Sequence, residues 1–334
     1  MRKVRTENAE GLVLAYDTTI VTKTFSKTLF QKGHVIGKKD IPKLKDSGVY
    51  YIWVEDGQRK IEEGEISLKV AEKIKGDGLI VKKEGHGMCS LFAERPGVVS
   101  LSLKASRSIN MKGIVMLISR RDGCSVGKGD LVSVVDSIPL SISEAKMKKF
   151  LSSCRQVISL KNFERRNVGL VITGTEIYEG RKEDKYRAII EEKCARYGWR
   201  LIYTKVVRDR DSEIVSAVKE ALRKGAEGIV ITGGMSVDPT DRTPSAVRKL
   251  GARIISYGIP VKPTTMTIVA ELGGIPIIAI SAGGIHYSKL NSIDLVFTRM
   301  MAGEIPSRNQ VAELGNGGLT EYYLSTLGIA GSPH

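Results

Sequence analysis

The second half of the chain alternates short apolar runs with amphipathic stretches, beginning near residue 165. Apolar runs of four to eight residues predict buried strands, and apolar positions three and four apart predict helices. We expect strands at 168–173, 199–207, 228–232, 253–256, 267–271 and 276–280, and helices at 184–197, 212–224 and about 288–302. This alternation predicts an α/β domain with a mostly parallel sheet covered on both faces, three layers in all.

Residues with capping chemistry stand at the ends of these predicted helices. Gly198 and Gly225 occupy the position just past a helix, where a left-handed conformation is common. Asp211 is placed to cap the helix that follows it. Thr243 and Pro244 predict a further helix, with the threonine as N-cap and the proline in the first turn.

The first half has a different pattern, with short β-type runs separated by glycine turns. Strands are expected at 79–82, 98–103, 114–119 and 131–135, and helices at 65–74 and 144–151. We interpret residues 1–155 as a β-rich N-terminal region of one or two small domains. Residues 156–305 form the α/β domain, and 306–334 a C-terminal surface extension.

Composition changes this picture little. The chain has 334 residues, and its four cysteines are Cys89, Cys124, Cys154 and Cys194, too widely spaced for a disulfide scaffold. The start of the chain is basic but has no apolar stretch, and the longest apolar runs fall short of the ~20 residues that a membrane span needs. We therefore expect a cytoplasmic protein with reduced thiols and no membrane contact.

The net charge of +15 raises the question of an anionic partner. Residues 1–155 hold 28 of the 52 Lys and Arg but 18 of the 37 Asp and Glu, so this region carries most of the excess. Nucleic acid is one candidate partner, and a solvated Lys-rich surface is the alternative. Aromatic residues make up 6% and do not alternate with basic ones, so nucleic-acid binding is the least favoured hypothesis.

Two loops carry unusual chemistry at the predicted carboxyl ends of strands, where open α/β sheets bind ligands. The first follows Thr173 and runs through Glu176 to Asp184, and the second spans 232–244. In the second, Gly233 and Gly234 allow a sharp turn with exposed amides, and the loop leads into a helix start that suits a phosphate.

The second loop also places two carboxylates, Asp238 and Asp241, beside this anion site. Carboxylates repel a phosphate unless a divalent cation lies between them, and Mg²⁺ is the natural mediator. The alternative is a glycine turn in which both Asp residues serve as caps and turn formers.

These loops resemble those of a known family. Residues 165–303 are similar to the molybdopterin-binding domain shared by molybdopterin adenylyltransferases and molybdopterin molybdenumtransferases. The resemblance rests on Gly-Gly-x-Ser-Val at 233–237, on Asp-Arg-Thr-Pro at 241–244 and on the spacing of Gly180 and Asp184. Residues 1–155 also resemble the β-rich leading half of clostridial-type molybdopterin-binding proteins.

The resemblance implies a site for molybdopterin with Mg²⁺. By position, Asp241, Asp238 and Glu176 would be catalytic, and Asp241 and Asp184 would hold the metal. The residues that would bind the cofactor are Gly174, Thr175, Gly233, Gly234, Met235, Ser236, Thr243, Lys262, Ser281, Gly283 and Gly284.

Three departures from the family pattern bear on catalysis. Thr175 replaces the Asp of a Thr-Gly-Asp-Glu loop, Thr264 replaces the Gly of a Lys-Pro-Gly element, and Ser-Ala-Gly-Gly at 281–284 replaces Pro-Gly-Asn-Pro. A β-branched Thr264 does not readily adopt a positive φ. The sequence therefore supports binding better than turnover.

Isolated residues outside these loops have more ordinary interpretations. The segment 86–89, His-Gly-Met-Cys, could supply metal ligands, but a β-turn is favoured. His286 lines the pocket or is a partly buried, hydrogen-bonded histidine, and Cys194 belongs to the core rather than to a nucleophile. Lys262, between Pro260 and Pro263, is either a rigidly held cation beside the pocket or a solvated loop lysine.

The leading hypothesis is a protein that binds molybdopterin or its nucleotide form, in cofactor biosynthesis or in delivery to a molybdoenzyme. An enzymatic version would be a transferase acting at the molybdopterin phosphate with Mg²⁺. The alternatives are a non-catalytic sensor or carrier and a basic nucleic-acid-binding protein. A homo-oligomer is also expected. The hypothesis requires that the loops beginning at residues 173 and 232 lie at the same end of the sheet.

Overall fold

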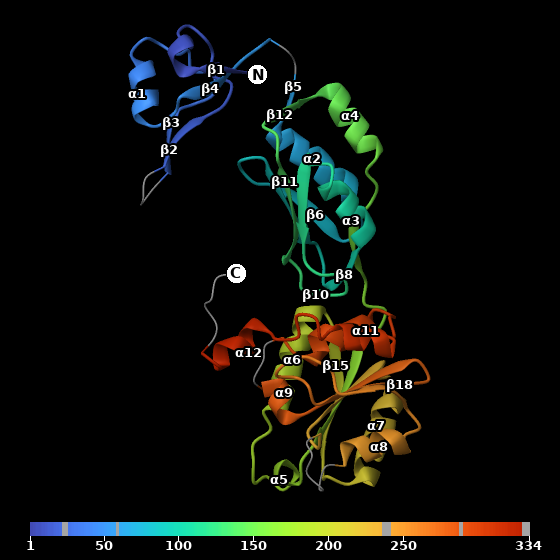
Figure 1. Ribbon diagram of the computed structural model, residues 1–334. Helices are drawn as coiled ribbons and strands as arrows, with labels where there is room; N and C mark the ends of the chain where they lie inside the picture. Colours follow the sequence, from blue (N-terminus) through green and yellow to red (C-terminus); the bar gives the residue numbers. More distant parts are fainter. Residues whose placement is uncertain (22–25, 58–59, 236–241, 287–289, 329–334) are drawn as a thin grey trace.

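The chain folds into three units that follow one another in sequence, seen in a computed structural model (Figure 1). The structure describes residues 1–21, 26–57, 60–235, 242–286 and 290–328. We name the units N-terminal (1–57), middle (60–161) and C-terminal (162–328). Separate hydrophobic clusters lie in each, so every unit has a core of its own.

The N-terminal unit is a small β-rich body in which the two strands of each pair run antiparallel. Its core contains Leu14, Ile36 and Leu44, all almost completely buried. The elements are β1 (Arg2–Arg5), η1 (Thr6–Asn8), β2 (Thr18–Val21), β3 (Ser26–Phe30), α1 (Asp40–Asp46) and β4 (Tyr51–Val54).

The middle unit is built around a four-stranded antiparallel sheet in the order β6-β7-β11-β9, against which α2 packs. Two further small sheets, β12-β5 and β10-β8-β13, complete it. Its strands are β5 (Lys60–Glu62), β6 (Leu79–Lys83), β7 (Met88–Ala93), β8 (Gly97–Leu101), β9 (Val115–Ser119), β10 (Ser125–Val126), β11 (Leu131–Ser137), β12 (Ser141–Ser143) and β13 (Ile158–Lys161). Its helices are α2 (Glu63–Ile74), α3 (Leu103–Asn110) and α4 (Glu144–Ser152).

The predicted strands and helices of the first half are all present. The elements that the sequence did not indicate include β2, β3, β4, β5, β7, β10, β12, β13, α1 and α3. The strand predicted at 98–103 ends at Leu101, because the Ser102 hydroxyl accepts a hydrogen bond from the Ala105 amide and begins α3. The favoured turn covers residues 85–87, whereas Met88 and Cys89 already belong to β7. The φ of His86 is +53°, and the Met88 amide donates to the Gly85 carbonyl. Cys89 is fully buried.

The C-terminal unit contains a six-stranded sheet in the order β15-β14-β16-β19-β18-β17. The first four strands run parallel to one another, and β18 runs antiparallel between β19 and β17. These strands are β14 (Asn167–Thr173), β15 (Arg200–Val207), β16 (Gly228–Thr232), β17 (Arg253–Tyr257), β18 (Thr267–Leu272) and β19 (Ile275–Ile280). All six predicted strands and the mostly parallel α/β fold are therefore confirmed.

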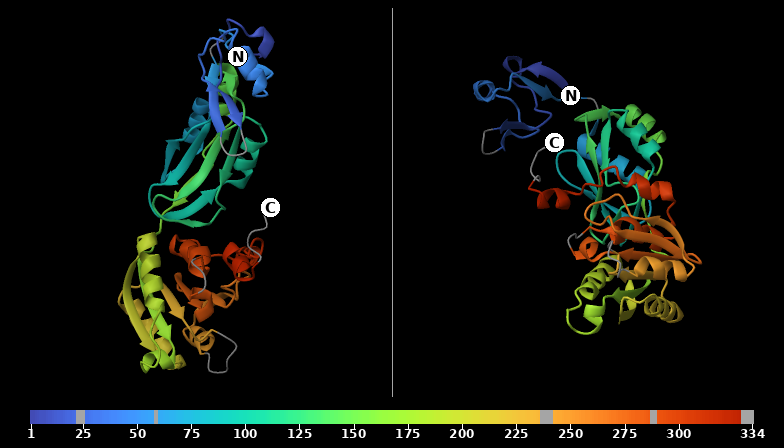
Figure 2. Two further views of the ribbon diagram at one scale, coloured as in Figure 1. Left: turned by 90° about the vertical axis from the view of Figure 1, so that its left-hand side faces the viewer. Right: turned by 60° about the horizontal axis from the view of Figure 1, so that its bottom comes forward.

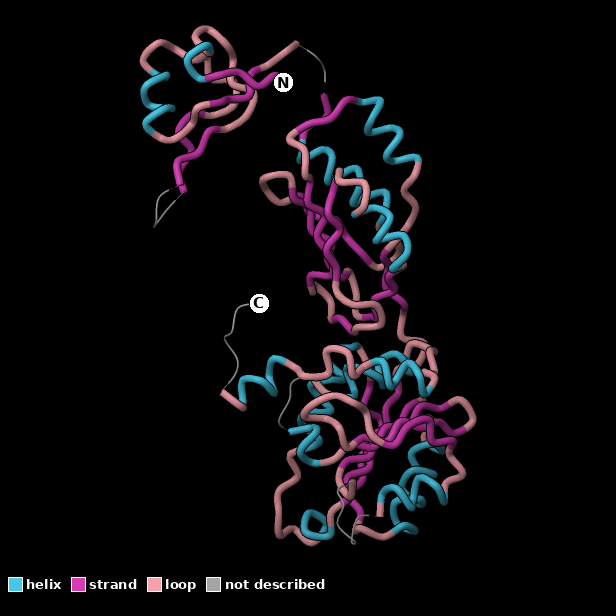
Figure 3. The backbone as a smooth tube through the Cα atoms, in the orientation of Figure 1, coloured by secondary structure: helices cyan, strands magenta, loops and turns pink. Residues whose placement is uncertain are grey.

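Helices cover both faces of this sheet (Figures 2 and 3). One face packs against α6, α9 and the η2–α10 segment, and the other against α7 and α8. The helices are α5 (Thr175–Tyr178), α6 (Tyr186–Tyr197), α7 (Asp211–Arg223), α8 (Thr243–Lys249), α9 (Ala282–His286), the π-helix η2 (Ile293–Phe297), α10 (Thr298–Met301), α11 (Arg308–Glu313) and α12 (Glu321–Thr326).

The residues at the helix ends can be compared with the caps predicted from the sequence. Gly198 and Gly225 follow α6 and α7 with φ of +68° and +90°, as predicted. Asp211 is the first residue of α7 rather than its cap, and its carboxylate accepts from Ser245 and pairs with Lys249 instead. Thr243 likewise lies inside α8, so its predicted capping role is wrong.

Helix α11, which follows Pro306, packs onto the outer strands of the sheet. Val311 of α11 is 2% exposed and shares a cluster with Ile255 and Ile259. No helix in the described ranges combines the length and the apolar character needed to cross a bilayer. All four cysteines are free, and burial raises the pKa of the Cys194 thiol to about 12, which agrees with its predicted place in the core.

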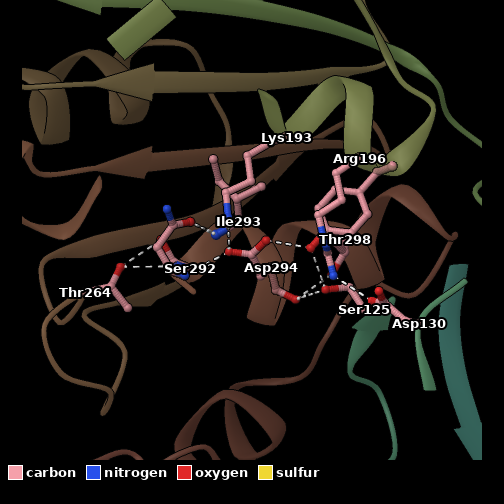
Figure 4. A network of polar contacts seen from close by, with 11 residues as sticks. Ser125, Asp130, Lys193, Arg196, Thr264, Ser292, Ile293, Asp294 and Thr298 are labelled. Atoms are coloured by element: carbon pink, nitrogen blue, oxygen red, sulfur yellow. Dashed lines mark hydrogen bonds and ion pairs between the residues drawn. The ribbon is translucent and has the colours of Figure 1, made fainter. Parts of the chain in front are cut away.

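The middle and C-terminal units meet at a buried polar junction centred on Asp294 of η2 (Figure 4). Its carboxylate accepts from Lys193 Nζ and from the Tyr197 hydroxyl, both at 2.6 Å. The Ser125 hydroxyl, from β10 of the middle unit, lies 2.9 Å from the Tyr197 hydroxyl and 3.0 Å from the Asp294 carbonyl oxygen. Arg196 adds an ion pair with Asp130 at 2.6 Å. We call Ser125, Lys193, Tyr197 and Asp294 the Asp294 junction.

Removing one member of the junction's ion pair should destabilise the C-terminal unit strongly. Asp294 is 2% exposed, so Asp294→Ala leaves the Lys193 ammonium buried without its carboxylate, at a cost of about 3–5 kcal/mol. Urea unfolding followed by Trp199 fluorescence, in a Trp53→Phe background, reports on this unit. Glu191→Ala, which breaks the exposed pair with Arg187, is the control and should leave the midpoint unchanged. Equal midpoints for the two variants would contradict the role of the junction.

Candidate functional site

Three loops that are distant in sequence leave the sheet at the same edge. Strands β14, β16 and β19 are parallel neighbours, and their last positions align through the pairs Ile172–Thr232 and Thr232–Ile280. The loops that begin after Thr173, Thr232 and Ile280 therefore start side by side, as the binding hypothesis requires. Helix α5, in the first of these loops, lies at the end of the sheet away from the middle unit (Figure 1). We call this edge the loop edge.

Gly233 and Gly234 are packed against the end of β14, and both need to be glycine. Their φ angles are +90° and +56°. A Cβ on Gly233 would lie 2.4 Å from the carbonyl oxygen of Thr173, and one on Gly234 would lie 2.7 Å from Thr243 Oγ1. The Thr243 hydroxyl donates to the Gly233 carbonyl at 3.0 Å, so the start of α8 holds the glycine turn in place.

Two buried hydroxyl groups at the loop edge have no hydrogen-bond partner among the described residues. They belong to Thr173 and Thr232, the last residues of β14 and β16, which are 3% and 0% exposed. Thr173 Oγ1 lies 3.0 Å from the positions that a Cβ would take on Gly233 and on Gly234. Buried polar groups in native structures are nearly always satisfied, so these two hydroxyls are exceptions that lie at the loop edge.

The loop after β14 is held by a residue that the sequence analysis missed, Asp209. Its Oδ2 accepts from the Thr175 amide at 2.8 Å and from the Thr175 hydroxyl at 3.0 Å. Asp209 follows the end of β15, so it belongs to the same edge. A carboxylate directly after a buried strand is the signal that could have identified it. Thr175, predicted to bind the cofactor, thus also ties two loops together.

Carboxylates gather around Tyr186 at the start of α6. Burial raises the pKa of Tyr186, and the negative charges of Glu176, Asp184 and Asp209 raise it further. Asp184 Oδ1 also accepts from the Tyr186 amide at 2.8 Å, at the first residue of α6. The Tyr186 ring stacks on the exposed ring of His286 with 4.7 Å between centroids, which joins the first loop to α9.

The loop after β19 is held by small polar residues. Ser281 Oγ accepts from the Gly284 amide at 3.3 Å, and Gly283 lies between them in α9. Thr264 is fully buried, and its hydroxyl donates to Ser292 Oγ at 3.1 Å. Thr264 is not among the described residues with positive φ, so a threonine fits here without the strain that replacing a glycine suggested.

Two residues predicted to bind the cofactor, Met235 and Lys262, instead make their contacts with other residues of the chain. Met235 is 1% exposed and packs in the core on the α7–α8 side of the sheet. Lys262 is exposed; its amide donates to the Gly318 carbonyl, its carbonyl accepts from Thr320, and its ammonium lies 6.0 Å from the Tyr323 ring. The C-terminal residues therefore hold Lys262.

The predicted metal ligands are only partly described. Ser236, Asp238 and Asp241 lie outside the described residues. Within the described ranges, no group of three His, Cys, Asp or Glu side chains is arranged to hold a metal ion. The Mg²⁺ site, and the roles of Asp241 and Asp238 in it, stay predictions from the sequence.

The glycine turn can be tested against a glycine with the same φ in open space. Gly233 and Gly225 both have φ of +90°, but a Cβ on Gly225 meets nothing within 4 Å. Gly225→Ala should cost only the backbone strain, about 1–2 kcal/mol. Gly233→Ala should cost a further 1–3 kcal/mol or so, because the new methyl group collides with the Thr173 carbonyl. Urea unfolding followed by Trp199 fluorescence measures both, and equal losses would show that the turn can relax.

Two family models match parts of the chain. Residues 169–293 match a probable molybdopterin binding domain, and residues 3–56 match a domain of unknown function. Curated relatives include the molybdopterin molybdenumtransferase of Bacillus subtilis (strain 168), 28% identical over 111 residues, which are 31% of this chain and 26% of that protein. The molybdopterin adenylyltransferase of Pyrococcus furiosus is 30% identical over 90 residues, 27% of this chain and 53% of that protein.

These alignments span about a quarter and about half of the two relatives. Among solved structures, the molybdopterin biosynthesis enzyme MoaB from Thermus thermophilus is similar, with 20% identity, 42% of this chain and 98% of that chain covered, and a TM-score of 0.35. The matched residues, 169–293, begin in β14 and end in η2, and so contain all three loops of the loop edge. The similarity predicted for residues 165–303 is confirmed, because residues 169–293 match the probable molybdopterin binding domain. The resemblance predicted for residues 1–155 stays a prediction, because residues 3–56 match a domain of unknown function.

Proposed function

We propose that the loop edge binds molybdopterin or its nucleotide form, and that the protein acts in the biosynthesis or delivery of the molybdenum cofactor. The observation that carries this proposal is the pair of buried, unpartnered hydroxyls of Thr173 and Thr232 beside the glycine turn. Three loops converge there, and the family match covers them all.

The residues at this edge suit a ligand with a polar ring and an anionic tail. Gly233 and Gly234 present backbone without side chains, which allows close approach of a ligand. Burial lowers the pKa of His286, the positive charges of Lys182 and Lys185 lower it further, and Asp184 opposes the shift. The positive charges of these lysines would attract a phosphate.

The transfer chemistry belongs to the proposal as well. In an enzymatic version, Asp241 and Asp238 would hold Mg²⁺ against the molybdopterin phosphate, with Glu176 and Asp184 on the facing loop. Mg²⁺ bound by such carboxylates would neutralise charge that develops on the phosphate. Asp209 would keep Thr175 and the facing loop in position. The relatives named above carry two different transferase names, so the match favours the ligand without selecting one reaction.

A carrier without catalytic activity is the second candidate. Thr175 replaces the family's aspartate, and its amide and hydroxyl are both used by Asp209. The family's glycine at position 264 is also replaced, by a threonine that is buried and hydrogen-bonded. Both changes leave these loops folded, whereas they remove a carboxylate and a glycine that the resemblance assigns to the transferases.

Replacing the Thr173 hydroxyl should change the free energy of unfolding and the affinity for molybdopterin in opposite directions. Thr173→Val removes a buried hydroxyl that has no partner among the described residues, so it should raise the free energy of unfolding by about 1 kcal/mol or more. The same change should weaken molybdopterin binding about tenfold, because the ligand loses a hydrogen bond. Thr204→Val, in the middle of β15, is the matched control.

Bound pterin, measured by its fluorescence after oxidation, reports the affinity, and urea unfolding reports the stability. Full pterin binding by the Thr173→Val protein would remove this hydroxyl from the site. Absence of pterin from the wild-type protein, even after incubation with molybdopterin, would contradict the proposed function itself.

Asp241→Ala distinguishes a transferase from a carrier. A loop carboxylate contributes little to the core, so the variant should fold normally and still bind pterin. If the protein is a transferase, Mg²⁺-dependent turnover of nucleotide with molybdopterin, or incorporation of molybdate, should fall by at least about a hundredfold. Turnover equal to the wild-type value would exclude Asp241 from catalysis, and no turnover in either protein would favour the carrier.

A further inference from the structure

The N-terminal unit exposes two aromatic rings on one face of a two-stranded sheet. In the β1–β4 pair, Lys3 lies opposite Trp53 and Arg5 lies opposite Tyr51. Side chains on alternate strand positions point to opposite faces, so these four residues share a face. We call this face the β1–β4 platform.

The fold of the N-terminal unit does not require these rings. Trp53 is 41% exposed and Tyr51 is 51% exposed, whereas Ile52 and Val54, on the other face of β4, are 2% and 0% exposed. The core of the unit is thus built by the opposite face. Neighbouring Trp and Tyr side chains that face outward expose apolar surface to water. Such an apolar patch often marks a binding site.

The cations on the platform lie directly against the rings. Lys3 Nζ is 4.6 Å from the centre of the Tyr51 ring. Arg5 contacts Glu7 at 3.4 Å and lies beside the Tyr51 hydroxyl, and the Tyr51 and Glu7 side chains raise the pKa of Arg5. Residues 1–155 also carry most of the excess positive charge of the chain. Such a face is complementary to a partner that is both aromatic and anionic.

We propose that the β1–β4 platform binds single-stranded nucleic acid, a function beyond the one assigned to the loop edge. Trp53 and Tyr51 are two residues apart on a strand, about 7 Å, so each can stack on one base of an extended single strand. Lys3 and Arg5 then face the phosphates between those bases. A protein partner fits less well, because lysine is depleted in the buried centres of protein interfaces.

The two tryptophans of the chain make the experiment specific. Trp53 is exposed, whereas Trp199 is 6% exposed and packed among Phe163, Tyr197 and Phe297. Titration of the full chain with a 15-mer oligothymidylate at low salt should quench Trp53 fluorescence on binding. Trp199→Phe should preserve the quenching, and fluorescence anisotropy of a labelled oligonucleotide should give the same affinity.

Variants of the platform then test each part of the argument. Trp53→Ala should weaken binding at least about fivefold, and Trp53→Phe should restore most of it, because a phenyl ring still stacks. Tyr257→Ala, an equally exposed tyrosine in β17, is the matched control and should bind normally. The double variant Lys3→Ala, Arg5→Ala should make the slope of log K against log salt shallower by about 1.4, while Lys128→Ala should not. Circular dichroism checks that every variant is folded.

Three outcomes would overturn the proposal. The first is no oligonucleotide binding at low salt, and the second is binding that Trp53→Ala leaves unchanged. The third is equal affinity for polyglutamate, which has no bases and would identify the face as a site for acidic polypeptides. None of these results depends on whether the loop edge binds molybdopterin.

Discussion

The parallel hydrogen bonding of β14, β16 and β19 is the constraint on which the candidate site depends. Parallel strands must be covered on both faces, which explains the helices on each side of the sheet and the continuous apolar character of these strands. Parallel neighbours also end at one edge, so loops separated by up to about a hundred residues start next to one another. The close contact of Gly233 with the Thr173 carbonyl follows from this arrangement, because only a residue without a side chain fits between two such strand ends.

Most of the C-terminal fold could be predicted from sequence because its signals are local. A buried parallel strand is a short apolar run, and Gly198 and Gly225 mark helix ends by their own conformation. The middle unit was harder, because β7 begins inside the segment 86–89 that was interpreted as a turn, and it owes its place to strands β6 and β11 on either side. Thr243 shows how tertiary contacts alter a local signal: its hydroxyl bonds to the Gly233 carbonyl, ten residues away, rather than capping its own helix.

Residues of the candidate site could be predicted from the sequence where the residue type alone indicates the function. They could not be predicted where the function depends on how the side chain packs. The paired glycines and the loop carboxylates could be read directly from the sequence. Thr173 and Thr232 look like ordinary strand ends, and only the structure reveals that their hydroxyls are buried without partners. Asp209 was missed because its role depends on Thr175. Thr175 lies in the loop after β14, whereas Asp209 lies in the loop after the neighbouring strand β15. Lys262 was predicted beside the pocket, but its surroundings are set by residues 318–323, far along the chain.

The Asp294 junction lies between the middle and C-terminal units, and it is linked by hydrogen bonds to the residues that support the loop after β19. Asp294 Oδ2 accepts from the Asn291 amide, and the neighbouring Ser292 contacts the buried Thr264, whose hydroxyl lies against Gly284. A buried ion pair contributes little net stability compared with an apolar core, but it penalises every arrangement that leaves one charge unpaired. The junction therefore specifies one position for the 290–298 segment. Since the Ser125 hydroxyl of the middle unit donates to the Asp294 backbone carbonyl, the docking of the middle unit and the position of the 290–298 segment depend on the same buried residue.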